Sequence, residues 1–152
     1  MHFCYKLFTY ILYLFAPIYL IFRKLKKKED KTRYKEKLSK INVSRGEGFL
    51  IWFHVASVGE AMSILPLIEN CLKEKNINRM LITSITLSSG KILEKRFSQN
   101  PKVNHQFLPL DVPILINKFL DHWKPNLSIF IDSEIWPNLI LGINKKKIPL
   151  LL

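Results

Sequence analysis

Residues 49–55 read FLIWFHV, an uninterrupted apolar run rich in residues that favour β-strands. Such a run is typical of a strand buried on both faces of a parallel sheet. Residues 56–60 read ASVGE and follow as a turn of small side chains, and a helical stripe of apolar residues begins at Glu60. This stretch therefore predicts a strand, a tight turn and a helix.

The same alternation continues along the rest of the chain. Further strands are expected at residues 79–84, 103–108, 127–131 and 148–152, and helices at residues 60–72, 91–97, 112–123 and 135–144. Strands alternating with helices predict an α/β fold with a parallel sheet. Because ligands of such sheets bind beyond the carboxyl ends of the strands, chemistry is expected in the loops at residues 56–60, 84–90 and 132–138.

The N-terminal region differs from the rest in composition. Residues 7–22 carry no charge, and a membrane-spanning helix needs about 20 apolar residues. Residues 23–40 hold ten lysines and arginines against three acidic residues. A local basic block beside an apolar segment favours anionic lipid over nucleic acid as the partner, and basic flanks stay in the cytoplasm. We expect residues 1–22 to be a membrane anchor, spanning or interfacial, and residues 23–45 a basic juxtamembrane helix or linker.

Two residues compete for the role of a base near the first turn. Glu60 is favoured in the first turn of a helix by the helix dipole alone. As a general base it would need its pKa raised by partial burial, against that dipole. His54 is the rival, although a histidine on an apolar strand is more often a satisfied core residue. Gly59 is expected to permit an unusual φ and to let a ligand approach the backbone.

A second polar stretch, DSEIWPN at residues 132–138, ends the fourth predicted strand. Helix capping explains its acidic and hydroxyl residues, but it does not explain the Trp and Asn. The hydroxyl-rich stretch at residues 83–90 suits a sugar or phosphate, although such loops are usually turns.

Together these pieces resemble the Kdo transferase family, the glycosyltransferases that act on lipid A. The family's H-x-A/V-S-V-G-E pattern stands at residues 54–60 as HVASVGE, and its E-x-E-L-W-P-N-L-I pattern stands at residues 132–140 as DSEIWPNLI. Its L-P-x-D-x-P and K-x-I-P patterns appear at residues 108–113 and 146–149. The resemblance covers essentially the whole chain, with Asp132 replacing the family's glutamate.

The resemblance implies a GT-B architecture, in which two Rossmann-like domains face each other across a cleft. Residues 46–152 would be the N-terminal, acceptor-binding domain, incomplete, with the C-terminal donor domain absent. The implied reaction transfers Kdo from CMP-Kdo to a lipid A precursor in lipopolysaccharide biosynthesis, with inversion and without a metal or cofactor. It would take place at the cytoplasmic face of the inner membrane, in contact with its lipids. The chain alone is expected to be inactive, with a separate C-terminal half as a possible partner.

The resemblance also implies roles for individual residues. Glu60 would be the catalytic base, and Ser57, Gly59, Glu134 and Asn138 would bind substrate or hold the loops that do. The alternative is a non-catalytic, membrane-anchored lipid-binding or scaffold fragment. A dinucleotide-binding enzyme is disfavoured, because no G-x-G-x-x-G follows the first strand.

Overall fold

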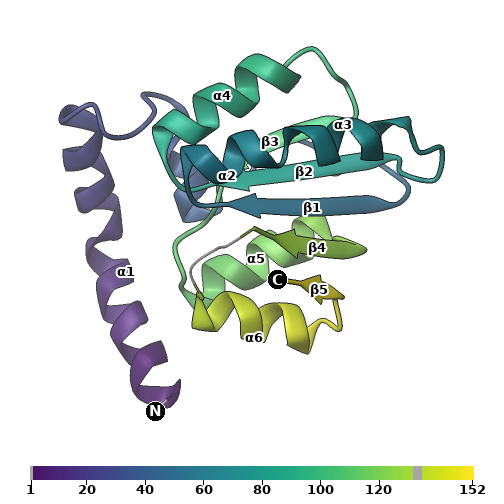
Figure 1. Cartoon of the computed structure of the whole chain (residues 1–152). Coiled ribbons are helices and arrows are strands. Elements are labelled where there is room, and N and C mark those ends of the chain that lie inside the picture. Colours follow the sequence, from purple (N-terminus) through teal and green to yellow (C-terminus); the bar gives the residue numbers. More distant parts are fainter. Residues whose placement is uncertain (1, 132–134) are drawn as a thin grey trace.

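The computed structural model describes residues 2–131 and 135–152, in which helices and strands alternate (Figure 1). All five predicted strands are present, within two residues of their expected bounds. In chain order the elements are α1 (His2–Leu25), the 3₁₀ helix η1 (Arg33–Leu38), β1 (Leu50–Val55), α2 (Val58–Ser63), α3 (Leu65–Lys73), β2 (Arg79–Ser84), α4 (Leu87–Phe97), β3 (Val103–Phe107), α5 (Pro113–Trp123), β4 (Leu127–Phe130), α6 (Pro137–Lys145) and β5 (Leu150–Leu151).

The strands form one parallel sheet in the order β3-β2-β1-β4-β5. The predicted parallel α/β sheet is therefore confirmed. The chain builds outward from β1 to β3 and then returns to the other side of β1 with β4. The strand order thus reverses between β1 and β4, and in open α/β sheets a ligand-binding crevice lies beyond the carboxyl ends at such a reversal. The loops that follow β1 and β4 flank this point.

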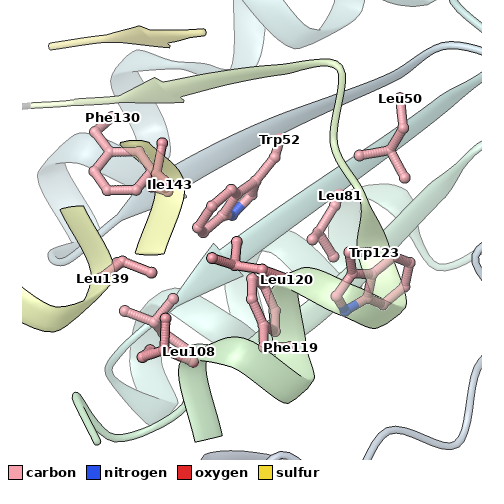
Figure 2. Close-up of a cluster of buried hydrophobic side chains, with 11 residues drawn as sticks. Leu50, Trp52, Leu81, Leu108, Phe119, Leu120, Trp123, Phe130, Leu139 and Ile143 are labelled. Carbon is pink, nitrogen blue, oxygen red and sulfur yellow. The ribbon is translucent and has the colours of Figure 1, made fainter. Parts of the chain in front are cut away.

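Helices cover both faces of the sheet, which explains why β1 is buried at every position and apolar at all but His54. Alternate side chains of a strand point to opposite faces. Trp52 packs against α5 and α6, whereas Phe53 packs in the second cluster with α2, α3 and α4. The Trp52 ring lies 5.1 Å from the Phe119 ring and 5.0 Å from the Phe130 ring, centroid to centroid (Figure 2). Central burial of β1 fixes the position of the turn that follows it.

Helix α4 begins earlier than the sequence indicates. The stretch expected as a loop up to residue 90 becomes helical at Leu87, because the Thr86 side chain caps the helix and accepts a hydrogen bond from the Ser89 N–H at 3.2 Å. Gly90 then packs against β3, where an added Cβ would lie 2.8 Å from the Phe107 ring. The close approach of the helix to Phe107 therefore explains why a glycine, and no larger residue, stands at this helical position.

Helix α1 lies beside the carboxyl ends of β1 and β2 (Figure 1). Its segment Cys4–Leu25 is long and apolar enough to cross a membrane, and only 17% of its 18-residue apolar window is buried. Most of its large apolar side chains are therefore exposed, and a narrow stripe faces the rest of the protein.

Candidate functional site

The turn after β1 holds Ser57 and Glu60 in a reciprocal capping arrangement at the start of α2. The Glu60 N–H donates to Ser57 Oγ at 3.2 Å, and Glu60 Oε2 accepts from the Ala56 N–H at 2.7 Å. This arrangement resembles an S-x-x-E capping box, except that the Glu60 carboxylate bonds to the N–H of Ala56, one residue before the N-cap Ser57. It places a half-buried carboxylate at the carboxyl end of the central strand. Capping therefore accounts for one oxygen of Glu60 and leaves the other to interact with a substrate.

Gly59 does not adopt the unusual φ that the sequence analysis expects. It is the second residue of α2, and its φ lies outside the left-handed region. A Cβ added there would meet only Ser57 Oγ, at 3.9 Å, which is ordinary contact distance. Because a helical glycine costs about 0.5–1 kcal/mol relative to alanine, the fold itself gives no reason for Gly59. The space beside Gly59 is open, so the geometry permits a ligand to lie against its backbone.

His54, the rival base, is a buried core residue. Its Nδ1 lies 2.9 Å from Thr83 Oγ1, which also accepts from the Trp52 indole N–H at 2.8 Å, and its ring contacts Phe130. Burial lowers the pKa of His54 to about 4, despite the nearby negative charge of Glu60. A fully buried imidazole with so low a pKa is a poor proton acceptor, and this favours Glu60 as the base.

The hydroxyl-rich stretch serves mainly to hold the fold. The Ser84 hydroxyl lies 2.9 Å from His105 Nε2, and the Arg33 guanidinium donates to the His105 carbonyl at 2.7 Å. Burial, followed by the charge of Arg33, lowers the pKa of His105 to about 3. Thr86 and Ser89 bond to each other at the start of α4. These contacts agree with the interpretation of the stretch as turns and caps.

Asp111, for which the sequence predicts no role, lies at the junction of three elements. Asp111 precedes α5, yet its carboxylate accepts from the backbone N–H groups of Asn138 at 3.0 Å and Leu139 at 2.8 Å. It thereby caps α6 from outside that helix. It also accepts from the Tyr5 hydroxyl of α1 at 2.8 Å. No local pattern reveals this role, because the partners lie 27 or more residues away.

Asn138 is buried beneath this carboxylate. Its side-chain amide donates to the Asp111 carbonyl at 2.7 Å, and its Oδ1 has no hydrogen-bond partner within the part of the chain that the structure describes. The arrangement positions the turn between β4 and α6, and substrate binding by Asn138 stays a prediction. Glu134, the other residue expected in this turn, lies outside the described residues.

Two adjoining cavities lie beside this junction and share Leu110, Asp111 and Trp136. One, of about 180 Å³, lies between α1 and the start of α5, and the other, of about 60 Å³, is also lined by Lys37. Across residues 2–131 and 135–152, no cluster of three or more His, Cys, Asp or Glu side chains is placed to hold a metal ion. The expectation of metal-free chemistry stays a prediction.

A sequence model of the family described as 3-deoxy-D-manno-octulosonic-acid transferase (kdotransferase) matches residues 28–152. This chain belongs to the Kdo transferase family. The match includes the whole carboxyl edge of the sheet, with Glu60, Asp111 and Asn138, whereas all of α1 lies outside it.

Curated Kdo transferases from distant organisms resemble the chain over most of its length. It is 43% identical over 139 residues to the 3-deoxy-D-manno-octulosonic acid transferase of Rickettsia bellii, covering 89% of the chain and 32% of that protein. It is 36% identical over 151 residues to the probable mitochondrial enzyme of Arabidopsis thaliana, covering 97% of the chain and 33% of that protein. The Rickettsia felis enzyme is 54% identical over 89 residues, covering 58% of the chain and 18% of that protein. The chain thus spans about a third, at most, of these Kdo transferases.

Proposed function

We propose that this chain is the acceptor-side part of an enzyme that transfers Kdo from CMP-Kdo to a lipid A precursor in lipopolysaccharide biosynthesis. Membership of the Kdo transferase family supports a role in Kdo transfer. The observation that carries the assignment of the base is the Glu60 carboxylate at the end of β1, beside the point where the strand order reverses. That is where a parallel sheet presents its ligand-binding crevice.

Glu60 would act as general base toward the acceptor hydroxyl. The Ala56 N–H holds Oε2 at 2.7 Å and fixes the carboxylate, and Oε1 takes the proton. As the O–H bond breaks, the acceptor oxygen forms a bond to the anomeric carbon of Kdo. The bond from that carbon to the phosphate oxygen of CMP breaks, and CMP leaves with the electron pair. Attack opposite the leaving group inverts the anomeric configuration.

The neighbouring residues would shape the acceptor side of the site. Ser57 and Gly59 are exposed beside Glu60, and the missing side chain of Gly59 leaves room for the sugar to approach. Asn138 lies in the first turn of α6, on the other side of the strand-order reversal, and Glu134 precedes it in the sequence. In the proposed enzyme this turn holds the acceptor or orders the loops around it.

We further propose a GT-B architecture, in which a second Rossmann-like domain binds most of CMP-Kdo. The strand order 3-2-1-4-5 suits the first domain of such an enzyme. The acceptor is a lipid, and the exposed apolar surface of α1 beside the same sheet edge supports attachment to the inner membrane at its cytoplasmic face. This chain would bring the lipid and the base together, and the second domain would supply the sugar.

The test is an assay of the completed enzyme, with this chain joined to the remaining two thirds of a Kdo transferase. The enzyme is incubated with CMP-Kdo and a lipid A precursor, and CMP release is compared with the mass of the lipid product. One Kdo added for each CMP released, with an inverted anomeric centre by NMR, is the expected result. Lipid binding without any Kdo addition would instead identify a lipid-binding scaffold.

A further inference from the structure

Length and composition leave two membrane arrangements open for α1. The segment Cys4–Leu25 has 22 residues, and a helix rises 1.5 Å per residue, so it is about 33 Å long. The hydrocarbon core of a bilayer is about 30 Å thick. The helix is therefore long enough to span, and it is equally able to lie in the interface with one face in the lipid. Its contacts with the rest of the protein distinguish the two arrangements.

The N-terminal end of α1 is bonded to the sheet-bearing part of the protein. Tyr5 Oη donates to Asp111 Oδ2 at 2.8 Å, and the Asn138 amide donates to Thr9 Oγ1 at 3.4 Å. Thr9 is only 6% exposed, although it lies within the apolar segment Cys4–Leu25, most of whose side chains are exposed. The first two turns of α1 therefore lie against the turns that begin α5 and α6.

The C-terminal end of α1 is held to the same body by a buried ion cluster. Arg23 Nε lies 2.6 Å from Glu29 Oε1, and Lys37 Nζ lies 2.8 Å from Glu29 Oε2. Glu29 and Lys37 are both buried, as is Leu20 in the turn before Arg23. Buried pairs such as these are costly to break, because one charge would stay buried without a partner.

The middle of the helix continues the same stripe. Thr9, Ala16 and Leu20 are buried and lie on one side of α1, in line with Tyr5 and Arg23. The opposite side carries exposed, mostly apolar side chains, among them Leu7, Ile11, Leu14, Ile18, Phe22 and Leu25. This helix therefore has a protein-facing side and an unpartnered apolar side, each running its full length.

From these contacts we infer that α1 does not span the bilayer but lies in the plane of its surface, with the apolar side in lipid. A spanning helix would place Tyr5 and Arg23 on opposite sides of a hydrocarbon layer, while the one body that bonds both residues lies in water. The in-plane arrangement keeps both sets of bonds. The inference rests on the membrane attachment in the proposed function and adds its geometry.

Charge complementarity identifies the occupant of this surface as an anionic bilayer. Lysines crowd the end of α1, and the charged residues that line a recess of about 450 Å³ there are four lysines and two acids: Lys24, Lys27, Lys31 and Lys91, with Glu29 and Asp30. Glu29 is already paired with Arg23 and Lys37, so the positive charge of the recess prevails. Lysines near an anionic surface contribute about 1 kcal/mol each to binding. With the helix flat, its apolar side lies among acyl chains while these lysines reach the headgroups of the same leaflet.

The in-plane arrangement also orients the sheet toward the lipid. One end of α1 contacts Asp111 and Asn138, before α5 and α6, and the recess at its other end is lined by Leu87 and Lys91 of α4. These elements follow the carboxyl ends of the strands, and Figure 1 shows α1 alongside that edge. A lipid acceptor would then reach Glu60 by moving along the membrane surface.

The exposed Cys4, near the start of α1, reports which side of the membrane that end occupies. The full chain carrying Cys71→Ser is placed in inside-out and right-side-out membrane vesicles and treated with a charged maleimide that does not cross membranes. The matched reporter carries Cys4→Ser, Cys71→Ser and Ser98→Cys, because Ser98 is exposed on the sheet-bearing part. We expect Cys4 and the Ser98→Cys reporter to be labelled in the same vesicles, at least tenfold more than in the other set.

Labelling of Cys4 only in the opposite vesicles would overturn the inference. If headgroups shield Cys4 from the reagent on both sides, an epitope tag at the N-terminus replaces it as the probe. Protease is added to the vesicles in which the Ser98→Cys reporter is labelled. It removes the tag together with the sheet-bearing part if α1 lies flat, and it cannot reach the tag if α1 spans. Failure of membrane attachment is a different result, since the chain would then stay in the supernatant after ultracentrifugation.

Discussion

The two helical glycines at the sheet edge, Gly59 and Gly90, are predicted to respond to alanine in opposite directions. In Gly59→Ala the new methyl group meets only Ser57 Oγ at 3.9 Å, so the gain in helix propensity, about 0.5–1 kcal/mol, raises the free energy of unfolding. In Gly90→Ala the methyl group would lie 2.8 Å from the Phe107 ring. Overpacking of this kind costs about 1–3 kcal/mol and outweighs the same gain.

For a chain of this size, 1 kcal/mol shifts Tm by roughly 2–4 °C. Calorimetry of this chain in detergent should therefore show a Tm raised by a few degrees for Gly59→Ala and lowered by a few degrees for Gly90→Ala. If Gly59 leaves room for the acceptor, the completed enzyme carrying Gly59→Ala should transfer Kdo more slowly although the variant is more stable. The expected loss of rate is about 10²-fold for a reacting group displaced by 1 Å. A Gly59→Ala enzyme with full kcat/KM would refute a ligand role for Gly59. A Tm lowered by Gly59→Ala would show that the added methyl group does not fit beside Ser57.

Two further predictions concern buried polar groups, and a third concerns the activity of a chain that spans about a third of its relatives. The pKa values of His54 and His105, lowered to about 4 and about 3, mean that unfolding takes up protons as the pH falls below about 6.5. The free energy of unfolding should then fall by roughly 2 kcal/mol per histidine between pH 7 and pH 5, measured by urea unfolding in detergent. Asp111→Asn should destabilise by about 1.5–3 kcal/mol, because the Asn138 and Leu139 N–H groups bond to different oxygens of the carboxylate and the amide replaces one of these oxygens by an NH₂ donor. Unchanged stability would show that α6 needs no such cap. The isolated chain should form no Kdo product from CMP-Kdo and a lipid A precursor, and activity should appear when the remaining part of the enzyme is supplied.

Much of the fold can be predicted from sequence because the strands of a parallel sheet are buried on both faces. The run at residues 49–55 is short, is rich in aromatic and β-branched residues and is followed by small turn residues, which favours a strand over a buried helix, and the observed strand Leu50–Val55 matches it. The start of α4 is predicted less well. Serine and glycine are poor helix formers, and the contact of Gly90 with Phe107, which decides the matter, joins residues that are distant in sequence.

In the candidate site, too, contacts between neighbours in sequence are easier to predict than contacts between distant residues. The helix dipole predicts an acidic residue in the first turn of α2, where Glu60 lies, whereas the contact of the Glu60 N–H with Ser57 Oγ is found only in the structure, although the S-x-x-E spacing is a local signal for it. Asp111 illustrates what no local pattern reveals. Its carboxylate meets Tyr5 and Asn138 only after α1, the turn before α5 and the start of α6 have come together. The helical pattern of α1 likewise predicts an apolar helix, but only its contacts at both ends indicate how it lies.

The most direct test of the account is the transfer rate of the completed enzyme carrying Glu60→Gln. Glutamine keeps an oxygen that can accept from the Ala56 N–H, so the cap and the Tm should be retained while the base is lost. Glu47→Gln is the matched control, since Glu47 is an exposed glutamate ahead of β1. In single-turnover assays with CMP-Kdo and a lipid A precursor, the account predicts a loss of about 10²- to 10⁴-fold for Glu60→Gln and none for Glu47→Gln. A Glu60→Gln enzyme that transfers Kdo at the wild-type rate would show that Glu60 serves only as a cap and that the base lies elsewhere.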